Sequence, residues 1–577
     1  MSPLPLIVNN YLKNIKGISV NKLNSIKSTH WDVIVIGTGV GGATTGHALA
    51  KAGKSVLFLE KGRVQLKGKC DSISGRYAED FFDPEASQPE NSHRDILRRA
   101  GRYWEKILEV TSDRPYSFSP FIGEGGGGSS ALYGMVMERF FSEDFNVNSY
   151  FNDVKGANLP EAWPISYEDI RPYYVLAERL YRVRGGLDPL RKLLLDPLMN
   201  PPALSKPSGE LYDFLVAKGL HPYVMPMACE YVPDCQECIG YICPKNCKND
   251  SSRICIKPAL EEYSAELLEQ CEVSHLEATT DRVTRVWCKY GQETLSLSAD
   301  LIILAAGALH TPAILLKSKS PTWPNGLANQ SGMVGKNLMR HYFDLYCVDT
   351  KAKVSAATLT KQIALNDAYF DDGHKLGTVQ AVGRLQSPDV LVKELWQEFE
   401  RKGHPIIARL IRSVTPLITY IVNRNISQRL ILTGIMEDIP YEHNFVDVTG
   451  SENDIKIHYK ISEYDKKRIS LFRKKVKELL HPYTFTFVKN AENNERLAHA
   501  CGTCRFGNDP ATSVLSADNR AHGLKNLYVV DASFFPTSTG INPSLTLAAN
   551  ALRVADHILL SSESLIHVQN LPTDSMV

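Results

Sequence analysis

Hydrophobic positions near the N-terminus predict a strand, a helix and a second strand in succession. Residues 33–36 form an apolar run that stops at Gly37, as expected of a buried parallel strand. Small and apolar residues at helical spacing follow as far as Gly53, and residues 55–60 form a second apolar run. The pattern predicts a strand–helix–strand unit with a right-handed crossover.

Similar patterns return later in the chain. Residues 299–318 are typical of a buried strand, a glycine turn and a helix, and residues 524–560 of a strand, a loop and a long helix. Ser166 stands before an acidic first turn, which predicts a helix start. From about residue 335 to 490, strand-like pieces such as 444–450 and 455–461 alternate with a lysine-rich helix at 465–478. We interpret that helix as a solvated face rather than a docking patch.

The most apolar later stretch is Pro405–Met436, and four arginines interrupt it: Arg409, Arg412, Arg424 and Arg429. No uninterrupted run therefore reaches the roughly 18–20 residues that a membrane span needs. We predict a buried or amphipathic helix pair here. A membrane-surface role stays open, without a feature of the sequence that supports it.

Composition places the chain among globular proteins of more than one core. Its 577 residues suggest two domains or one large composite, and 43% hydrophobic with 22% charged residues is ordinary for such a protein. A formal net charge of +1 gives no field that would attract nucleic acid. The first twenty residues lack an uninterrupted apolar core, so we expect a poorly ordered tail rather than a signal peptide, and a cytoplasmic protein.

Six of the twelve cysteines lie between Cys229 and Cys255, and they include one C-x-x-C pair, Cys235 and Cys238. Close spacing of this kind is found in zinc sites and iron–sulfur clusters, and a cytosolic C-x-x-C is also found in redox exchange. A structural loop of free thiols or disulfides is the third interpretation. The spacing does not decide between them, and no residue is assigned as a metal ligand.

The glycines after the first predicted strand have the spacing of a dinucleotide-binding loop. Gly37 permits a tight turn, Gly39 lets the backbone approach a pyrophosphate, and Gly42 lets the helix pack on the strand. The helix N-terminus offers free N–H groups to phosphate. Glu60 ends the second strand, where an acid accepts hydrogen bonds from ribose hydroxyls and disfavours a phosphorylated ribose. The unit does not by itself separate NAD from FAD.

A second feature favours flavin. Asp531 ends a late predicted strand, where its carboxylate or neighbouring amides such as that of Ala532 can meet the ribityl–phosphate part of a cofactor held first by the N-terminal loop. At this point the chain resembles the glucose–methanol–choline (GMC) oxidoreductase family over residues 31–560. The resemblance rests on GTGVGG, GGSSALYGMVMER, WPISYEDIRPYY, LAAGALHTPAILL, VGKNLMRH and the tail from HACGT to LRVAD.

The resemblance implies an α/β fold, with a Rossmann-like FAD-binding domain and a second, antiparallel-sheet substrate domain. We expect the FAD domain from residues 28–65, 115–145, 265–330 and 495–562, and the substrate domain from 146–264 and 331–494. Residues 1–27 and 563–577 would be flexible tails. In a few members of the family a cysteine-rich region near the flavin binds a three-iron cluster, through adjacent cysteines that this chain lacks.

The resemblance also implies site residues. His499, in H-x-x-G-T, and Asn542, before Pro543, match the reacting pair. The residues of the glycine loop, Glu60, Asp531, Ala532 and Asn542 would contact FAD. Five further contacts would come from the second glycine run and the tail: Gly127, Gly128, Ser129, Ser130 and Pro543. Leu132 stands where covalent members carry histidine, so FAD should be bound non-covalently. Tyr133 stands where asparagine is usual, which removes one expected flavin contact.

The expected activity is FAD-dependent oxidation of an alcohol CH–OH group to a carbonyl. His499 would take the hydroxyl proton, and the flavin would take a hydride. Asn542 would donate to the substrate oxygen, although capping the following helix is a rival role. The partners would be a small-molecule alcohol and either oxygen or a separate electron acceptor. Hydroxynitrile-lyase-like chemistry and photochemical decarboxylation are alternative uses of the same fold.

Overall fold

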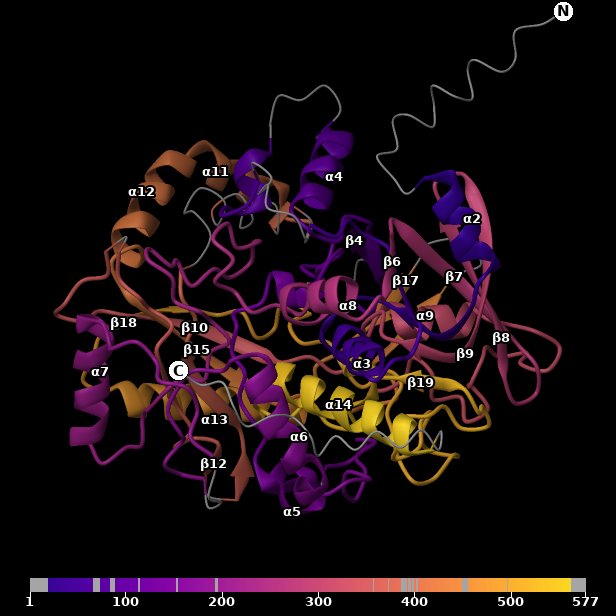
Figure 1. Cartoon of the computed structure of the whole chain (residues 1–577). Helices are drawn as coiled ribbons and strands as arrows, with labels where there is room; N and C mark the ends of the chain where they lie inside the picture. The colour runs from indigo at the N-terminus through magenta and orange to yellow at the C-terminus, as the bar shows by residue number, and fades with distance from the viewer. Residues whose placement is uncertain are drawn as a thin grey trace, which may run out of the picture.

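A computed structural model describes residues 19–561 of the chain (Figure 1). The description has short gaps, at 66–72, 83–88, 113–114, 152–153, 192–195, 356, 372, 385–391, 393–395, 397–398, 401–402, 449–454 and 496. The predicted tails at 1–18 and 563–577 lie outside the described residues.

One half of the molecule is built on a seven-stranded sheet, whose strands come from both the beginning and the end of the chain. Its parallel part follows the order β6-β2-β1-β9, with β19 also paired to β9, and β8 and β7 extend it in antiparallel fashion. The strands are β1 (His30–Ile36), β2 (Val56–Glu60), β6 (Glu266–Glu269), β7 (Cys271–Ala278), β8 (Val283–Tyr290), β9 (Glu293–Leu304) and β19 (Leu527–Val529). β2 is buried along its whole length, because the parallel part is covered on both faces.

Helices α3 (Val40–Lys51) and α14 (Ser544–Ser561) pack together beside this sheet, and α6 (Tyr167–Leu180) packs on α14 (Figure 1). Ser166 caps α6 as predicted, with its side chain accepting from the backbone of Asp169. The predicted tail over residues 1–27 is wrong for residues 20–27. These residues belong to α2 (Val20–Ser28), which buries Leu23 and Ile26.

The second half is built on a six-stranded antiparallel sheet of order β18-β10-β15-β14-β11-β5. The strands are β5 (Tyr223–Val224), β10 (Tyr342–Val348), β11 (Ile363–Leu365), β14 (Gly377–Ala381), β15 (Leu430–Met436) and β18 (Phe485–Val488). The predicted lysine-rich helix is α13 (Glu463–Leu480), which packs on β15 and buries Phe472. The predicted combination of an α/β Rossmann-like half and an antiparallel half is therefore confirmed. The exact domain boundaries stay a prediction.

Two smaller sheets and several short helices complete the fold. The strand-like pieces at 444–450 and 455–461 are β16 (Phe445–Val448) and β17 (Ile455–His458), and they join β3 (Ile107–Glu109) and β4 (Tyr116–Phe118) instead of the six-stranded sheet. β12 (Phe370–Asp371) pairs with β13 (His374–Lys375). The remaining α-helices are α4 (Pro89–Arg99), α5 (Asn148–Phe151), α7 (Lys206–Ala217), α8 (Lys257–Glu262), α9 (His310–Lys317), α11 (Pro405–Ser413) and α12 (Thr415–Ile426).

The apolar stretch after Pro405 forms the predicted helix pair, α11 and α12. In the described part of the chain, no single helix is long and apolar enough to cross a membrane. These two helices pass that test only when taken together, across a bend of 71°.

A buried ion cluster joins the two halves. Lys375 Nζ lies 2.7 Å from Asp144 and 2.8 Å from Glu437, and all three side chains are at most 3% exposed. Asp144 also accepts from the Tyr369 hydroxyl, while Glu437 accepts from the backbone N–H of Thr539. The cluster therefore fixes the six-stranded sheet to the segment that follows β19.

Replacing Lys375 with Met should lower the melting temperature of the holoenzyme, as measured by scanning fluorimetry. Two carboxylates would remain buried without their cation, and breaking a buried pair in this way costs about 3–5 kcal/mol. Lys474→Met is the matched control, because the Lys474 side chain is 74% exposed and its pair with Glu478 is 3.9 Å long. Equal melting temperatures for the two variants would contradict a stabilising role for the cluster.

Candidate active site

A cavity of about 560 Å³ opens where the parallel strands end. Its wall includes residues at or just after the ends of β1, β2, β9 and β19, namely Gly37, Glu60, Ala305 and Asp531. Ligands of doubly wound sheets bind at this carboxyl edge. Leu497–Ala500 and Phe343 also line the cavity, so the wall draws on both halves of the molecule.

The glycine loop after β1 has the shape that a dinucleotide requires. Gly37 has φ +98°, and a Cβ there would lie 2.3 Å from the carbonyl oxygen of Ala305. A Cβ on Gly42 would lie 2.3 Å from the Gly37 oxygen, so α3 packs directly on the loop. Gly39 is the N-cap residue of α3. A Cβ built on it would have open space around it to a distance of 4 Å. The free N–H groups of the first turn of α3 therefore adjoin open room in the cavity wall, which fits a pyrophosphate.

Glu60 lines the cavity, but its carboxylate is already engaged. One oxygen accepts from the backbone N–H and the hydroxyl of Thr38, at 3.1 and 2.6 Å, and the other accepts from Gly62 and Gly125. Burial raises the pKa of this carboxyl, and the four hydrogen bonds oppose that shift. A ribose hydroxyl would have to share or replace one of these donors.

The second glycine run lies against the start of α3. Gly127 and Gly128 have φ +86° and +50°, and a Cβ on Gly128 would lie 3.1 Å from the Cα of Gly39. Gly128, Ser129 and Ser130 line the cavity, whereas Gly127 is not in its wall and turns the chain behind it. The two loops form one continuous part of the wall.

Asp531 joins the end of β19 to the turn after β9. Its carboxylate accepts from the backbone N–H groups of Ser533 and Gly307, at 2.8 and 2.9 Å, and from the Thr311 hydroxyl. The carboxylate thus holds two loops in place. Its neighbour Ala532 lines the cavity beside it.

His499, which lines the cavity, forms a pair with a second histidine, His341. The two Nδ1 atoms lie 2.8 Å apart, and His341 Nε2 lies 3.1 Å from the carbonyl oxygen of Ser538. A carbonyl only accepts, so His341 Nε2 carries the proton and its Nδ1 is an acceptor. His499 Nδ1 must then donate, which leaves the Nε2 of His499 as the bare nitrogen. Among the described residues, no protein group bonds to that nitrogen.

The backbone of His499 is held in an unusual conformation. Its φ is +58°, in the left-handed region that side chains other than glycine rarely adopt. Two hydrogen bonds between Met339 and Cys501, at 3.0 and 2.9 Å, fix the chain on either side of the histidine pair. Strain of this kind persists only where the surroundings impose it, and it gathers at functional sites.

Burial keeps both imidazoles neutral. It lowers the pKa of His499 to about 3, with a further contribution from His341, and it lowers the pKa of His341 to about 4. The carbonyl of Ser538 opposes the shift in His341. The pair therefore carries no charge at neutral pH.

Asn542 is 8% exposed and lies just before the cavity residues Pro543 and Ser544, although it is not itself in the wall. Its Oδ1 is buried and has no partner among the described residues. A carboxamide that capped α14 would accept a backbone N–H through this oxygen. The structure therefore does not support the capping role considered for Asn542.

Three titratable residues of the site were not predicted from the sequence. His341 lies in the quoted motif VGKNLMRH, but no pattern indicated that it would meet His499, 158 positions away. His310 and Glu124 both line the cavity, and each has a buried atom, Nε2 and Oε2, that meets no hydrogen-bond partner in the part of the chain that the structure describes. Burial lowers the pKa of His310 to about 3 and raises that of Glu124 to about 7.

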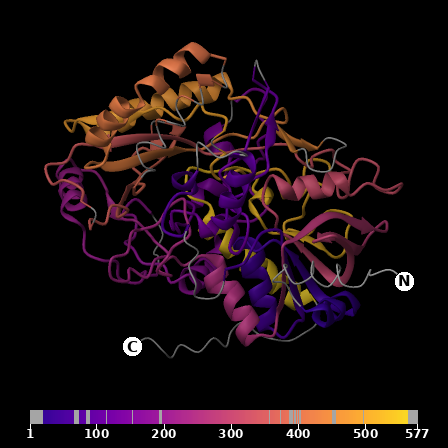
Figure 2. The ribbon, with the colours of Figure 1, turned by 90° about the horizontal axis from the view of Figure 1, so that it is seen from above.

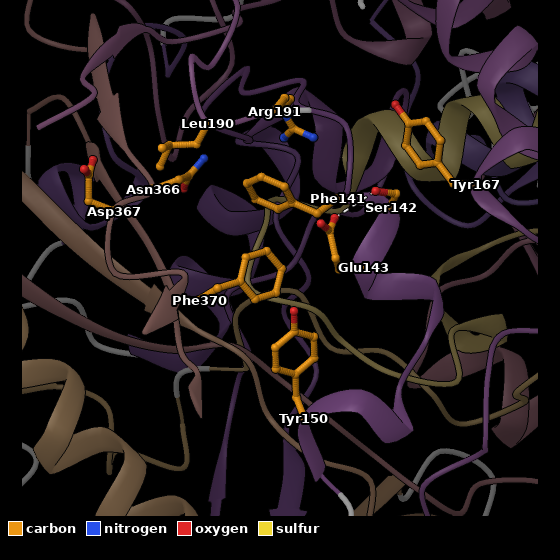
Figure 3. Close-up of a pocket in the computed structure, with 10 residues that line it drawn as sticks. All are labelled: Phe141, Ser142, Glu143, Tyr150, Tyr167, Leu190, Arg191, Asn366, Asp367 and Phe370. Carbon is orange, nitrogen blue, oxygen red and sulfur yellow. Dashed lines mark hydrogen bonds between the residues drawn. The ribbon is translucent and has the colours of Figure 1, made fainter. Parts of the chain in front are cut away.

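A second cavity, of about 310 Å³, contains none of the predicted site residues. Figure 3 shows Phe141, Phe370 and Tyr150 following one another along it, with the polar Asn366 and Asp367 at its left edge. The Tyr150 and Phe370 rings stack at 5.0 Å. Its described wall contains no glycine loop, so we take the larger cavity as the candidate site.

Curated relatives align along almost the full chain. The chain is 26% identical to paromamine 6'-oxidase of Streptomyces fradiae, over 91% of this chain and 90% of that protein. It is 23% identical to the fructose dehydrogenase large subunit of Gluconobacter japonicus, over 92% and 97%. With 2-methyl-1,2-propanediol dehydrogenase of Mycolicibacterium austroafricanum the identity is 22%, over 94% and 98%.

Solved structures share the fold. Pyridoxine 4-oxidase from Mesorbium loti matches with a TM-score of 0.60 at 16% identity, over 92% of this chain and 99% of that one. A variant of formate oxidase from Aspergillus oryzae matches with a TM-score of 0.60 at 14% identity, over 94% of this chain and 100% of that one. Two family models described as GMC oxidoreductase match residues 225–343 and 440–551. The chain therefore belongs to the GMC oxidoreductase family, and its cofactor is FAD.

Proposed function

We propose that this enzyme oxidises a CH–OH group of a small-molecule alcohol to a carbonyl, with His499 as the base. Oxidation of an alcohol agrees with the relatives, which are named as oxidases or dehydrogenases of paromamine, fructose and a propanediol. The observation that carries the role of His499 is its bare Nε2 in the wall of the dinucleotide cavity, fixed by the bond to His341.

Bound FAD supplies the acceptor for the hydride that leaves the alcohol carbon. The loops at Gly37–Gly42 and Gly128–Ser130 and the first turn of α3 would hold its phosphates. Ala532 and Pro543 would contact it farther along the wall. Leu132 offers no nucleophile, so this attachment is non-covalent.

The residues on the substrate side then have separate tasks. His499 Nε2 accepts the hydroxyl proton as negative charge builds on the oxygen. The Nδ1–H of His499 remains bonded to His341, which steadies the cation that results. Asn542 would turn its amide N–H toward the same oxygen, as a neutral donor that leaves the base unpaired. Burial excludes water from the pair, which strengthens each of these contacts.

Replacing His499 with Asn should lower turnover about 100-fold or more while FAD stays bound. Asparagine tolerates φ +58° better than alanine does, so the variant tests the imidazole rather than the backbone. Both proteins would be mixed with a panel of alcohols without oxygen, and the visible absorbance of oxidised flavin followed. Loss of that absorbance in the wild type alone supports the proposal.

Two outcomes would contradict it. Carbonyl formation with unchanged flavin absorbance would mean lyase chemistry. Equal rates of bleaching in the two proteins would remove His499 from the reaction, even with alcohol oxidation established.

His341→Leu should lower kcat by about 10- to 100-fold with unchanged FAD content, because His499 loses the acceptor that fixes its tautomer. His341→Asn should restore part of the rate, since its Oδ1 can accept from His499 Nδ1. In the wild type, kcat/KM should stay flat from about pH 8 down to about pH 5, since only protonated His499 is inactive and its pKa is low.

A wild-type profile that falls through the ordinary histidine pKa, or equal rates for the two variants, would disprove this positioning role.

A further inference from the structure

Four cysteines of the loop at 229–247 have their sulfur atoms in close contact, one after another. Cys235 Sγ lies 3.7 Å from that of Cys229 and 3.3 Å from that of Cys247, and Cys243 Sγ lies 3.2 Å from that of Cys247. The sulfurs of Cys229, Cys235 and Cys247 all lie within 4.8 Å of one another. Every cysteine of this loop is a free thiol in the structure, and Cys238 packs in the same hydrophobic cluster.

We propose that Cys229, Cys235 and Cys247 hold one tetrahedral thiophilic metal ion, with Cys243 beside Cys247 as the fourth ligand and Zn²⁺ the ion that suits four thiolates best. Four thiolates at about 2.3 Å from a zinc ion stand about 3.8 Å apart. An iron–sulfur cluster places several irons and sulfides between its thiolates and so holds them farther apart. The sulfurs of Cys229, Cys235 and Cys247 are close enough together for a single ion, whereas Cys243 is close only to Cys247 and would have to move toward the other two sulfurs to complete the set. Each thiol that binds releases a proton.

The backbone of the loop supports this assignment independently. Four of its residues other than glycine have left-handed φ values, between +47° and +56°: Tyr231, Asp234, Glu237 and Asn246. No helix or strand lies between Val224 and Ser252. Repeated strain without regular structure needs a strong local constraint, and an ion bound at the centre of the loop supplies one.

Charge at the site is also suited to thiolates. Lys248 and Lys361 are each 1% exposed, and both interact electrostatically with cysteines of the loop. Lys248 Nζ donates to two backbone carbonyls, of Ala131 and Tyr241, at 2.9 and 3.1 Å. Four thiolates on a divalent ion leave net negative charge, which these buried cations balance.

The ion would fix one wall of the active-site cavity. Ile239 and Gly240 line the cavity from this loop, and the Gly240 N–H donates to the Leu132 carbonyl at 2.7 Å. The proposed metal is therefore structural, and it lies outside the reacting groups. Its loss would loosen the wall without removing the base.

The test is metal analysis of the holoenzyme after gel filtration with a mild chelator. One zinc per chain is expected, and protein grown with Co²⁺ should show thiolate-to-cobalt charge-transfer bands. Cys235→Ser and Cys247→Ser should each lose at least nine-tenths of the metal. Cys347→Ser, a buried cysteine in β10 outside the loop, is the matched control and should keep it.

Metal-free wild type with full FAD content would overturn the proposal, and so would disulfides within the loop or iron accompanied by acid-labile sulfide. Metal content is read separately from flavin bleaching. The proposal can therefore fail while the alcohol oxidation stands. The wild-type zinc and cobalt measurements decide the question even if the serine variants do not fold.

A different observation concerns α11 and α12, which leave an apolar surface uncovered. Ile406, Leu410, Leu417 and Tyr420 are 76%, 63%, 59% and 62% exposed, and Ala408 is the one buried residue of α11. Figure 1 places the two helices at the outer edge of the molecule, beyond β18 and β10, and the orange helices stand at the rim again in Figure 2. A contiguous group of exposed apolar side chains marks an interaction site.

The charges on these two helices are of one sign. Arg409, Arg412 and Arg424 are exposed on the same two helices, and residues 405–426 contain no Asp or Glu. A protein partner with an apolar groove would not need this pattern. An anionic lipid surface matches both the apolar and the cationic groups.

We infer that α11 and α12 lie in the interface of a membrane that carries anionic lipids. Helices of nine and twelve residues are about 14 and 18 Å long, well short of the hydrocarbon core of about 30 Å. The bend of 71° between them also favours lying on the membrane over crossing it. The pair would sink its apolar side chains between lipids and keep the arginines at the headgroups.

Sedimentation with vesicles tests this surface. The holoenzyme should bind vesicles of phosphatidylcholine with phosphatidylglycerol at least tenfold better than phosphatidylcholine alone, and less in high salt. Leu410→Asp with Leu417→Asp should abolish binding. Leu187→Asp with Val216→Asp is the control, since these exposed residues lie elsewhere, at 42% and 50% exposure. No binding by the wild type, or a dimer that only the first double variant disperses, would overturn the inference.

Discussion

The segment that follows β19 is the constraint on which the site depends, because it is bonded to both halves of the molecule. At its start, Asp531 holds the turn after β9 through Gly307 and Thr311. A few residues later, the carbonyl of Ser538 orients His341. The next residues bond to the six-stranded sheet and its loops, through Glu437 and Tyr369. A shift of this segment would change the cavity wall and the histidine pair together.

The cofactor half could be predicted because steric rules fix it locally. Gly37 and Gly42 each approach the backbone so closely that a Cβ would overlap it, and the spacing of such glycines is visible in a single strand–turn–helix unit. The partners of His499 could not be predicted in this way, since His341 and Ser538 meet it only through the packing of distant segments. Glu60 shows the same limit. Its position was predicted, but not that Gly125, 65 positions later, would take one of its acceptor sites.

Unpaired buried polar atoms are rare in folded proteins, and several of those in the described residues gather at this cavity. His310 Nε2 and Glu124 Oε2 belong to its wall, and Asn542 Oδ1 lies next to it. Each costs free energy as long as nothing bonds to it. Their position beside a neutral histidine pair indicates where ligand groups, rather than protein groups, complete the hydrogen bonding. The site is thus organised in advance for FAD and an oxygen-bearing substrate.

Tyr133 explains how the cysteine-rich loop and the cofactor wall act as one unit. The family usually has asparagine at this position, and the departure suggested only a lost flavin contact. In the structure the Tyr133 hydroxyl donates to the carbonyl of Asn249 at 2.6 Å, two positions after Cys247. Together with the bond from Gly240 to Leu132, this ties the second glycine run to the middle of the cysteine-rich loop and to the residues that follow Cys247. Tyr133 thus holds the cysteine-rich loop in place where the family usually has an asparagine that contacts the cofactor. Because that loop forms part of the cavity wall, the change at Tyr133 and the cysteines are best understood as one adaptation.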